Sequence, residues 1–383
     1  MQRSRWIRCS SLLLVILFSS CTSHAIFDDN TSEQLNDSSY ITKTDQSFTP
    51  SKTGQSTQIS SATISPTPSP TLPKITTLLF TGIIVPARCV QAGIDESGDP
   101  HYLYNNVREI ITNADLSIGT LNATISDSTR HEGCVRSWEL VGGADNADAM
   151  RDAGFDIMGM ATNHIKDCGF PSCGDRAFLD TLDNMHRVGI LPVGAGHNLE
   201  EALQSVVVEV NGIRFGFVSL GEVFVSERIF ADHNKPGIAK LTEKNLLTAI
   251  DTAKQIADVV IVMPHSGPED FIEPSSTQRK WARVSIEGGA DLVVMNHAHV
   301  IQPYQKIDGV MVFYGLGNFV FDQIWSRDHQ QSVMLLIKFQ GVNLISFRFI
   351  PTVVDQDGTV HLATDVETKE ILDRITEASQ QLE

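Results

Sequence analysis

Four short apolar runs of this chain end in polar side chains, and this arrangement limits what the chain can fold into. The runs are DIMGMATNH, VVIVMPHSGPE, DLVVMNHAH and VMVFYGLGNF, and each is typical of a β-strand followed by a loop. Helix-like stretches separate them, which predicts an α/β layered fold. Because ligands of open α/β sheets bind beyond the carboxyl ends of strands, we expect these polar groups to meet in one crevice.

The alternation of strand and helix patterns begins near residue 75 and continues to the end of the chain. The predicted strands are Thr76–Val85, Phe155–Met160, Arg214–Leu220, Val259–Met263, Asp291–Met295 and Val310–Tyr314. The predicted helices are Tyr102–Asn113, Arg176–Val188, Glu243–Ala257 and Ser275–Gly288. We also expect an antiparallel hairpin over Ser332–Pro351 and a terminal helix over Asp365–Leu382.

The N-terminus has the features of an export signal. Three arginines precede the apolar run Leu12–Phe18, which is too short to span a bilayer. The following FSSC resembles a bacterial lipobox, so we expect Cys21 to carry a lipid anchor. Ordinary cleavage near Ala25 is the alternative.

Residues 22–74 are rich in Ser, Thr and Pro and nearly lack aliphatic clusters. Such a segment buries too little apolar surface to offset the entropy of ordering it. We therefore expect a signal peptide over 1–21, a disordered tether over 22–74 and one folded domain over 75–383. A processed pro-segment is the alternative to the tether. The expected location is the bacterial cell envelope, as an exported, membrane-anchored lipoprotein.

The net charge of −17 limits the possible partners. Binding to nucleic acid requires a basic surface, so we expect no nucleic-acid partner. The same charge gives no electrostatic help towards an acidic polymer.

Four of the six cysteines fall in the expected domain, namely Cys89, Cys134, Cys168 and Cys173. An even number in an exported domain suggests disulfides, with four buried thiols as the alternative. Gly and Pro between Cys168 and Cys173 disfavour a helix there. A turn would bring the two Cα atoms within the roughly 5.5 Å that a disulfide prefers, so we expect this pair.

Histidines and one asparagine follow the apolar runs at matching positions. Asn163 and His164 follow the first run, and His265 ends the second. His297 and His299 form a His-x-His pair, which in an extended segment points both rings the same way. Because imidazole is a common ligand of zinc, copper, iron and nickel, this pattern predicts a shared metal site.

The order Asn-His, His, His-x-His resembles that of the calcineurin-like metallophosphoesterase superfamily, and more closely that of the CapA family, associated with poly-γ-glutamate capsule synthesis. The resemblance rests on AGFDIMGMATNHIKDCG, ILPVGAGHNLEEA, HSGPE and GADLVVMNHAHVIQPYQKIDGVMVFYGLGNFVFD, and extends over about Leu78–Pro351. It implies a metallophosphoesterase-like layered sandwich, with mixed β-sheets flanked by helices.

Two positions depart from the family pattern. Ile83 stands where the family's Gly-Asp motif has a metal-binding Asp, and Asn122 stands where Asn-Leu-Glu has a bridging Glu. By the resemblance, Asn163, His265 and His297 remain as ligands of one metal. His299 remains as a ligand of the other. Two dications about 4 Å apart need anionic bridges, so we expect at most one divalent ion, Mn, Fe or Zn, or none.

The resemblance implies a CapA-like envelope protein that takes part in the synthesis, export or anchoring of poly-γ-glutamate or a similar anionic capsular polymer. We expect it to bind the polymer or its synthesis machinery rather than turn a substrate over. The alternative is a single-metal hydrolase of phosphoesters or amides, with His164 as proton donor and Glu269 as a further catalytic residue. Cys89 and Cys134 each follow a degenerate motif and form the expected second disulfide.

Overall fold

The computed structural model describes residues 74–131, 133–168, 173–222 and 227–382. The predicted signal peptide, Cys21 and nearly all of the predicted tether lie outside the described residues. So do the four residues between Cys168 and Cys173. In the described part of the chain, no helix has both the length and the apolar character needed to cross a membrane.

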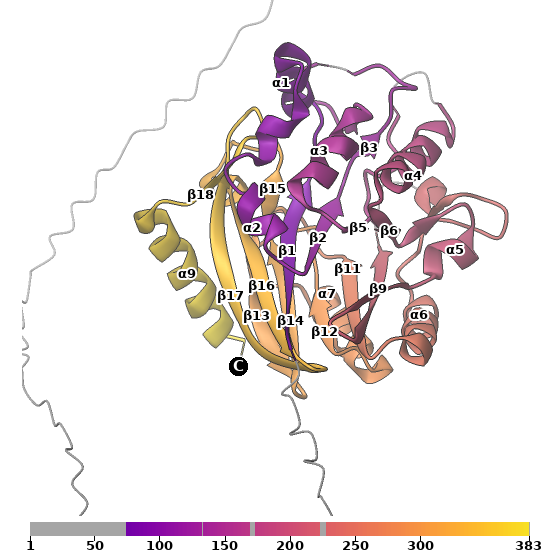
Figure 1. Cartoon of the computed structure of the whole chain (residues 1–383), viewed down its shortest axis with the longest axis vertical. Coiled ribbons are helices and arrows are strands. Elements are labelled where there is room, and N and C mark those ends of the chain that lie inside the picture. Colours follow the sequence, from indigo (N-terminus) through magenta and orange to yellow (C-terminus); the bar gives the residue numbers. More distant parts are fainter. Residues whose placement is uncertain (1–73, 132, 169–172, 223–226, 383) are drawn as a thin grey trace, which may run out of the picture. The chain divides into compact units, whose positions relative to one another are not determined.

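Two β-sheets form the centre of the domain (Figure 1). The first sheet has the order β18 (Val360–Leu362), β17 (Asn343–Val354), β16 (Gln331–Gln340), β1 (Ile75–Ile84), β2 (Leu116–Leu121), β5 (Ile157–Gly159), β6 (Leu191–Val193), and β15 (Asn318–Val320) also pairs with β1. Strands β1, β2, β5 and β6 are parallel, whereas β16, β17 and β18 continue the sheet in antiparallel pairs.

The second sheet has the order β13 (Ile301–Ile307), β14 (Val310–Leu316), β12 (Leu292–Val294), β11 (Val259–His265), β9 (Ile213–Gly221), β8 (Val206–Val210). Its four central strands are parallel, and the two edge strands pair antiparallel. Two small sheets pair β3 (Thr124–Ile125) with β4 (Val141–Gly142), and β7 (Ala195–Gly196) with β10 (Gly237–Ile238).

The two sheets pack face to face, with helices on their outer faces. Phe80 of β1 and Phe217 of β9 lie in the core between the sheets, whereas Leu79 of β1 packs in the outer core. This alternation follows from the period of two along a strand. Helices α1 (Cys89–Ser97), α2 (Arg108–Thr112), α3 (Asp145–Ala153) and α4 (Arg176–Val188) contribute to the outer core of the first sheet. Helices α5 (Leu199–Leu203), α6 (Glu243–Ile256) and α7 (Ser276–Gly288) contribute to that of the second. The predicted α/β sandwich with mixed sheets flanked by helices is confirmed.

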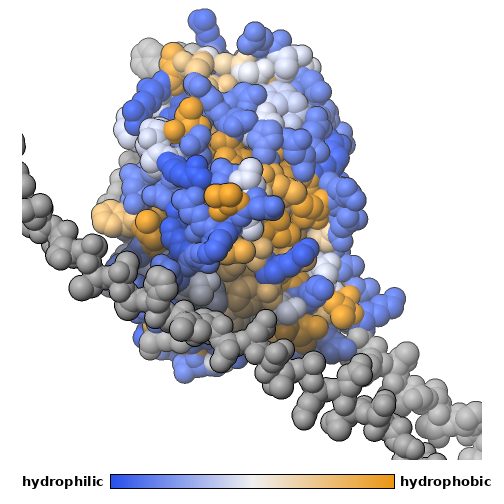
Figure 2. All heavy atoms as spheres, turned by 90° about the vertical axis from the view of Figure 1, so that its left-hand side faces the viewer, coloured by the Kyte–Doolittle hydropathy of each residue, from blue (hydrophilic) through white to orange (hydrophobic). Residues whose placement is uncertain are grey.

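Helix α9 (Asp365–Gln380) packs along β13 and β17. It begins with a capping box between Thr364 and Glu367, and buries Ile371 and Ile375. On the face that carries α9 and β17, hydrophobic residues form patches among hydrophilic ones (Figure 2). The short helices η1 (Pro100–Tyr104), η2 (Glu227–Ile229) and α8 (Arg327–Gln330) lie in connections.

Each predicted strand is present within a few residues of its predicted bounds, and the terminal helix and the β16–β17 hairpin are confirmed. The predicted helix Tyr102–Asn113 is wrong as a single element, because η1 and α2 are separated by a turn. In that turn, the Asn106 side chain donates a hydrogen bond to Val360 O at 3.2 Å. The helical stretch therefore breaks at asparagines, which have low helix propensity, and the break coincides with this tertiary contact to β18.

Candidate functional site

The carboxyl ends of both sheets meet at one place, as the sequence predicts. Strand β11 ends at His265, and this residue forms a parallel bridge with Asn296, just after β12. The loop after β5 supplies residues from the first sheet. Six predicted side chains gather here: Asn163, His164, His265, Glu269, His297 and His299. Their proposed roles remain predictions.

Three of these side chains bring donor atoms close together. The Nε2 atom of His265 lies 3.0 Å from Asn163 Oδ1 and 3.0 Å from His297 Nδ1. A neutral imidazole carries one N–H, so Nε2 cannot direct a good hydrogen bond to both atoms. Two ligands about 2.1 Å from one metal ion lie roughly 3.0–3.4 Å apart, as the atoms of each of these two pairs do. The two nitrogens and one oxygen therefore fit a single divalent ion.

Glu269 offers a second way to hold a cation beside the same histidine. Ligand atoms of Glu269, His297 and His299 all lie within 4.8 Å of one another. His299 Nδ1 contacts Asn318 Oδ1 at 2.8 Å, so Nδ1 donates and Nε2 keeps its lone pair. His297 faces His265 through Nδ1 and Glu269 through Nε2, the latter at 3.9 Å. Because a neutral imidazole has one free lone pair, His297 can serve only one ion at a time.

Burial keeps the three histidines neutral. Desolvation, and then repulsion from neighbouring histidines, lowers the pKa of His297 to about 4 and that of His299 to about 3. The same causes lower the pKa of His265 well below 6.5. Burial raises the pKa of Glu269. Metal ligation requires neutral imidazole, so near pH 7 these three histidines are in the form that binds metal.

His164 is held by a carboxylate that the sequence analysis did not identify. Its Nδ1 lies 2.6 Å from Asp167 Oδ2, and burial raises the pKa of Asp167. His164, Glu269 and His299 line a cavity of about 30 Å³, enough for one or two water molecules. The spacing of three residues in NHIKD is a usable signal for the Asp167 contact.

The two degenerate positions lie at the first-sheet side of the site. Ile83 is buried in the apolar core, and its backbone N–H donates to Gly317 O at 2.9 Å. Glycine is required at position 82, because the chain passes so close to Gly317 that a Cβ on residue 82 would lie 2.1 Å from Gly317 O. Asn122 is fully buried, and its Oδ1 accepts from the His164 backbone N–H at 3.1 Å. Its Nδ2 has no hydrogen-bond partner among the described residues. The strand ends keep their backbone contacts without the two carboxylates.

The prediction that His297 and His299 lie in an extended segment is wrong. Their φ angles are 134° and 60°, and the segment after β12 bends. Asn296 explains the bend, because its side chain donates to Thr120 Oγ1 at 2.8 Å and accepts from Leu316 N at 3.3 Å. The two rings still lie 6.1 Å apart. Positive φ angles outside glycine often occur at functional sites.

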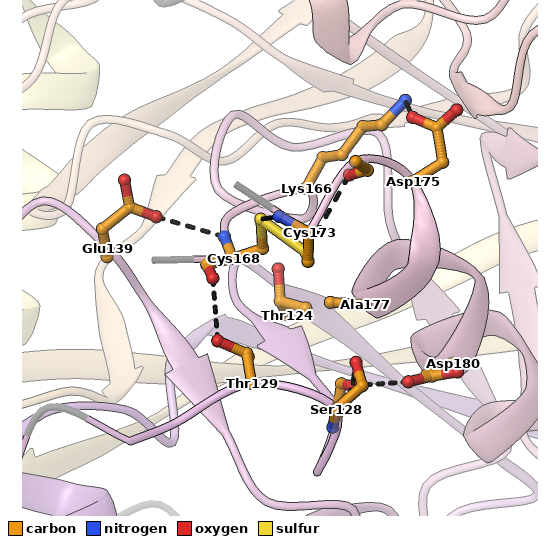
Figure 3. The surroundings of a disulfide bond; sticks show 12 residues. Thr124, Ser128, Thr129, Glu139, Lys166, Cys168, Cys173, Asp175, Ala177 and Asp180 are labelled. Atoms are coloured by element: carbon orange, nitrogen blue, oxygen red, sulfur yellow. Dashed lines mark hydrogen bonds and ion pairs between the residues drawn. A yellow bond between two sulfur atoms is a disulfide. The ribbon is translucent and has the colours of Figure 1, made fainter. Parts of the chain in front are cut away.

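Both predicted disulfides are present, Cys89–Cys134 and Cys168–Cys173. Cys168 of the second directly follows Asp167 in the sequence. Around it, Glu139 accepts from the Cys168 backbone N–H at 3.1 Å, and Thr129 donates to Cys168 O at 2.8 Å (Figure 3). The loop that carries Asp167 is therefore tied on several sides.

Arg88 and Trp138 also line the cavity, and the sequence analysis missed both. Arg88 forms a buried ion pair with Asp322, 234 residues further along the chain. A contact over such a separation leaves no periodic signal in the sequence.

Comparisons with known proteins agree with the resemblance seen in the sequence. The family model "Bacterial capsule synthesis protein PGA_cap" matches residues 77–323. The PGA biosynthesis protein CapA of Bacillus subtilis is 29% identical over 76% of this chain and 73% of its own length. The capsule biosynthesis protein CapA of Bacillus anthracis is 29% identical over 67% of this chain and 62% of its own length.

Solved structures that resemble the chain include a novel phosphatase from Mycoplasma pneumoniae, with a TM-score of 0.46 and 16% identity over 73% of this chain and 94% of that one. They also include the NAD nucleotidase of Haemophilus influenzae, with a TM-score of 0.44 and 14% identity over 79% of this chain and 63% of that one. The family model covers well over half of the chain and all six side chains of the site, and the chain therefore belongs to the PGA_cap family of bacterial capsule synthesis proteins.

Proposed function

We propose that this protein takes part in poly-γ-glutamate capsule synthesis, and that its site binds the polymer or the machinery that makes it. The observation that carries this proposal is the family match, which spans the whole site. Two relatives with CapA in their names align over two thirds or more of the chain, and those names refer to capsule or PGA biosynthesis.

The site is proposed to hold one divalent ion, Mn, Fe or Zn, through Asn163, His265 and His297. When bound, such an ion supplies a positive charge for a carboxylate or phosphate oxygen of the ligand. The chain's own residues orient the histidines next to these ligands, because Asn318 fixes His299 and Asp167 fixes His164. A bound cation would attract an anionic polymer, whereas the net charge of −17 on its own would repel it.

Binding without turnover is favoured by Ile83 and Asn122. A two-metal site needs carboxylates at these positions to offset the repulsion between the ions, and neither side chain is charged. The second candidate is a single-metal hydrolase of phosphoesters or amides. It is supported by His164, which Asp167 orients beside the small cavity that Glu269 also lines. His164 would donate a proton to the leaving group.

Metal analysis and two assays on the purified full chain separate these candidates. We expect about one equivalent of metal, binding of γ-linked glutamate oligomers, and no turnover of a phosphodiester or of the oligomer with added manganese. Turnover that disappears in His164→Gln would establish the hydrolase instead. Protein that neither binds the oligomer nor cleaves any of these substrates would overturn the proposed role.

The location is proposed from the N-terminal sequence, with residues 1–21 as a signal, 22–74 as a tether and 75–383 as the domain. Lipidation of Cys21 would hold the domain at the membrane of the cell envelope. We expect the wild-type protein to sediment with membranes and Cys21→Ser to be released or to keep its signal. Soluble wild-type protein that starts near Ile26 would refute the lipid anchor.

A further inference from the structure

Two exposed tryptophans lie at the mouth of the site. Trp138 is 84% exposed, yet it lines the small cavity together with His164 and Glu269. Trp325 is 48% exposed and follows Gln323, which lines the same cavity. Large aromatic rings that remain in water are unusual away from binding surfaces, because their burial contributes much of the energy of association.

The guanidinium group of Arg136 lies over the Trp325 ring. The guanidinium carbon of Arg136 lies 4.5 Å from the centroid of the Trp325 ring. Stacking holds the flat face of the guanidinium and leaves its N–H edge open. Arg136 is exposed, and among the described residues it forms no ion pair with a carboxylate. In a chain of net charge −17, this leaves a cation available for an anionic ligand.

The two loops that carry these side chains are fixed to each other. Arg88 forms an ion pair with Asp322 on one loop, and its Nη1 donates to Ser137 O on the other at 2.9 Å. The Arg88 guanidinium also lies over the Phe321 ring at 4.8 Å. The Cys89–Cys134 disulfide ties the loop of Trp138 to the start of α1. Binding to this surface would therefore cost little ordering entropy.

We propose that Trp138, Trp325 and Arg136 form a subsite for a stretch of γ-linked polyglutamate outside the metal-binding residues. This inference rests on the proposed function and names how the polymer is held. Each γ-glutamyl unit has two methylenes in its backbone and one free carboxylate. The methylenes pack on the tryptophan rings, and a carboxylate accepts from the open edge of Arg136.

The test is titration of the full chain with an oligomer of γ-linked glutamate, followed by calorimetry and by tryptophan fluorescence. We expect Trp138→Ala, Trp325→Ala and Arg136→Gln each to weaken binding about tenfold, a loss typical of a contact at the centre of an interface. Arg136→Lys should recover part of the loss. Binding by Arg136→Gln should also depend less on salt than binding by the wild type, because one screened contact is absent.

Matched controls come from exposed residues on the face of α9 and β17. Val366→Ala removes an exposed hydrophobic side chain and Arg348→Gln removes an exposed cation, and neither should change binding. If the wild type binds the oligomer and all three variants, Trp138→Ala, Trp325→Ala and Arg136→Gln, bind it equally well, the subsite is overturned and the proposed function is retained. A wild-type protein that binds no oligomer would overturn both the subsite and the proposed function. Tryptophan quenching by a neutral glycan, with none by the oligomer, would assign the rings to a sugar ligand and overturn the inference.

Discussion

The two sheets contribute unlike chemistry to the same site. The second sheet ends in His265, His297 and His299, which are buried and neutral, and His297 lies close enough to share a cation with either of the other two. The first sheet ends in Ile83 and Asn122, which are equally buried but offer no carboxylate to a cation. Both ends keep their backbone contacts, for instance that of Ile83 N with Gly317 O. The comparison teaches that the fold of this site does not depend on its carboxylate ligands.

The two sides also differ in how their loops are held. Both disulfides lie beside the first sheet: Cys89–Cys134 joins the start of α1 to a loop, and Cys168–Cys173 lies between β5 and α4. The described loops after β11 and β12 are held by side-chain hydrogen bonds, such as those of Asn296. The first side is therefore fixed covalently, and the second by side-chain hydrogen bonds next to the buried, neutral histidines.

The largest expected effect is acid destabilisation from the histidine side. The unfolded histidines titrate near 6.5, and the folded ones at about 4, at about 3 and well below 6.5. The unfolded state thus binds more protons below pH 6.5, so stability is lost as pH falls through that value. Three histidines give a slope of up to about 4 kcal/mol per pH unit. Urea unfolding in chelator should show it, and His297→Asn should reduce the slope by about a third. An unchanged slope in this variant would contradict the assignment.

The next effect probes the covalent side. In the chain-entropy account, loss of Cys89–Cys134 costs about 4 kcal/mol and loss of Cys168–Cys173 about 2 kcal/mol, because the first closes the longer loop. Paired Cys→Ser variants under denaturant provide the measurement, and each pair serves as the other's control. Equal stability of both variants and the wild type would show that these bonds do not hold the first side.

A smaller effect is expected when a carboxylate returns to the first sheet. Ile83→Asp should cost about 3 kcal/mol of unfolding free energy, because it removes a buried apolar side chain and buries a carboxyl group. Ile83→Asn is the uncharged control. Combined with Asn122→Glu, the substitution should raise bound manganese from about one equivalent towards two. Metal content that stays at one would mean that the missing carboxylates are not what limits the site.

The smallest effect concerns the ion itself. With metal at a hundred times its Kd, a bound ion stabilises the wild type by about 2.7 kcal/mol. His265→Ala should abolish this increment, measured as the difference in unfolding between metal and chelator. His361→Ala, which changes a half-buried histidine paired with Asp355 away from the site, should keep the increment. A wild type without any increment would point to a site that binds its ligand without metal.

The sequence by itself determined the alternation of strands and helices, the strand ends that meet and the Cys168–Cys173 pair, whereas the sandwich and the Cys89–Cys134 pair were predicted through the family resemblance and its motifs. The first three follow from local rules, because continuous apolar runs such as Val259–Met263 and the short spacing between Cys168 and Cys173 report on structure within one element or loop. The family motifs then indicated which histidines would gather. Only the tertiary structure decided that His297 and His299 leave the extended conformation, since Asn296 bends the chain by bonding to β2 and β14. It also decided the tryptophan-lined mouth, because Arg88 forms a buried ion pair with Asp322, 234 residues further along the chain, and no local pattern encodes such a contact.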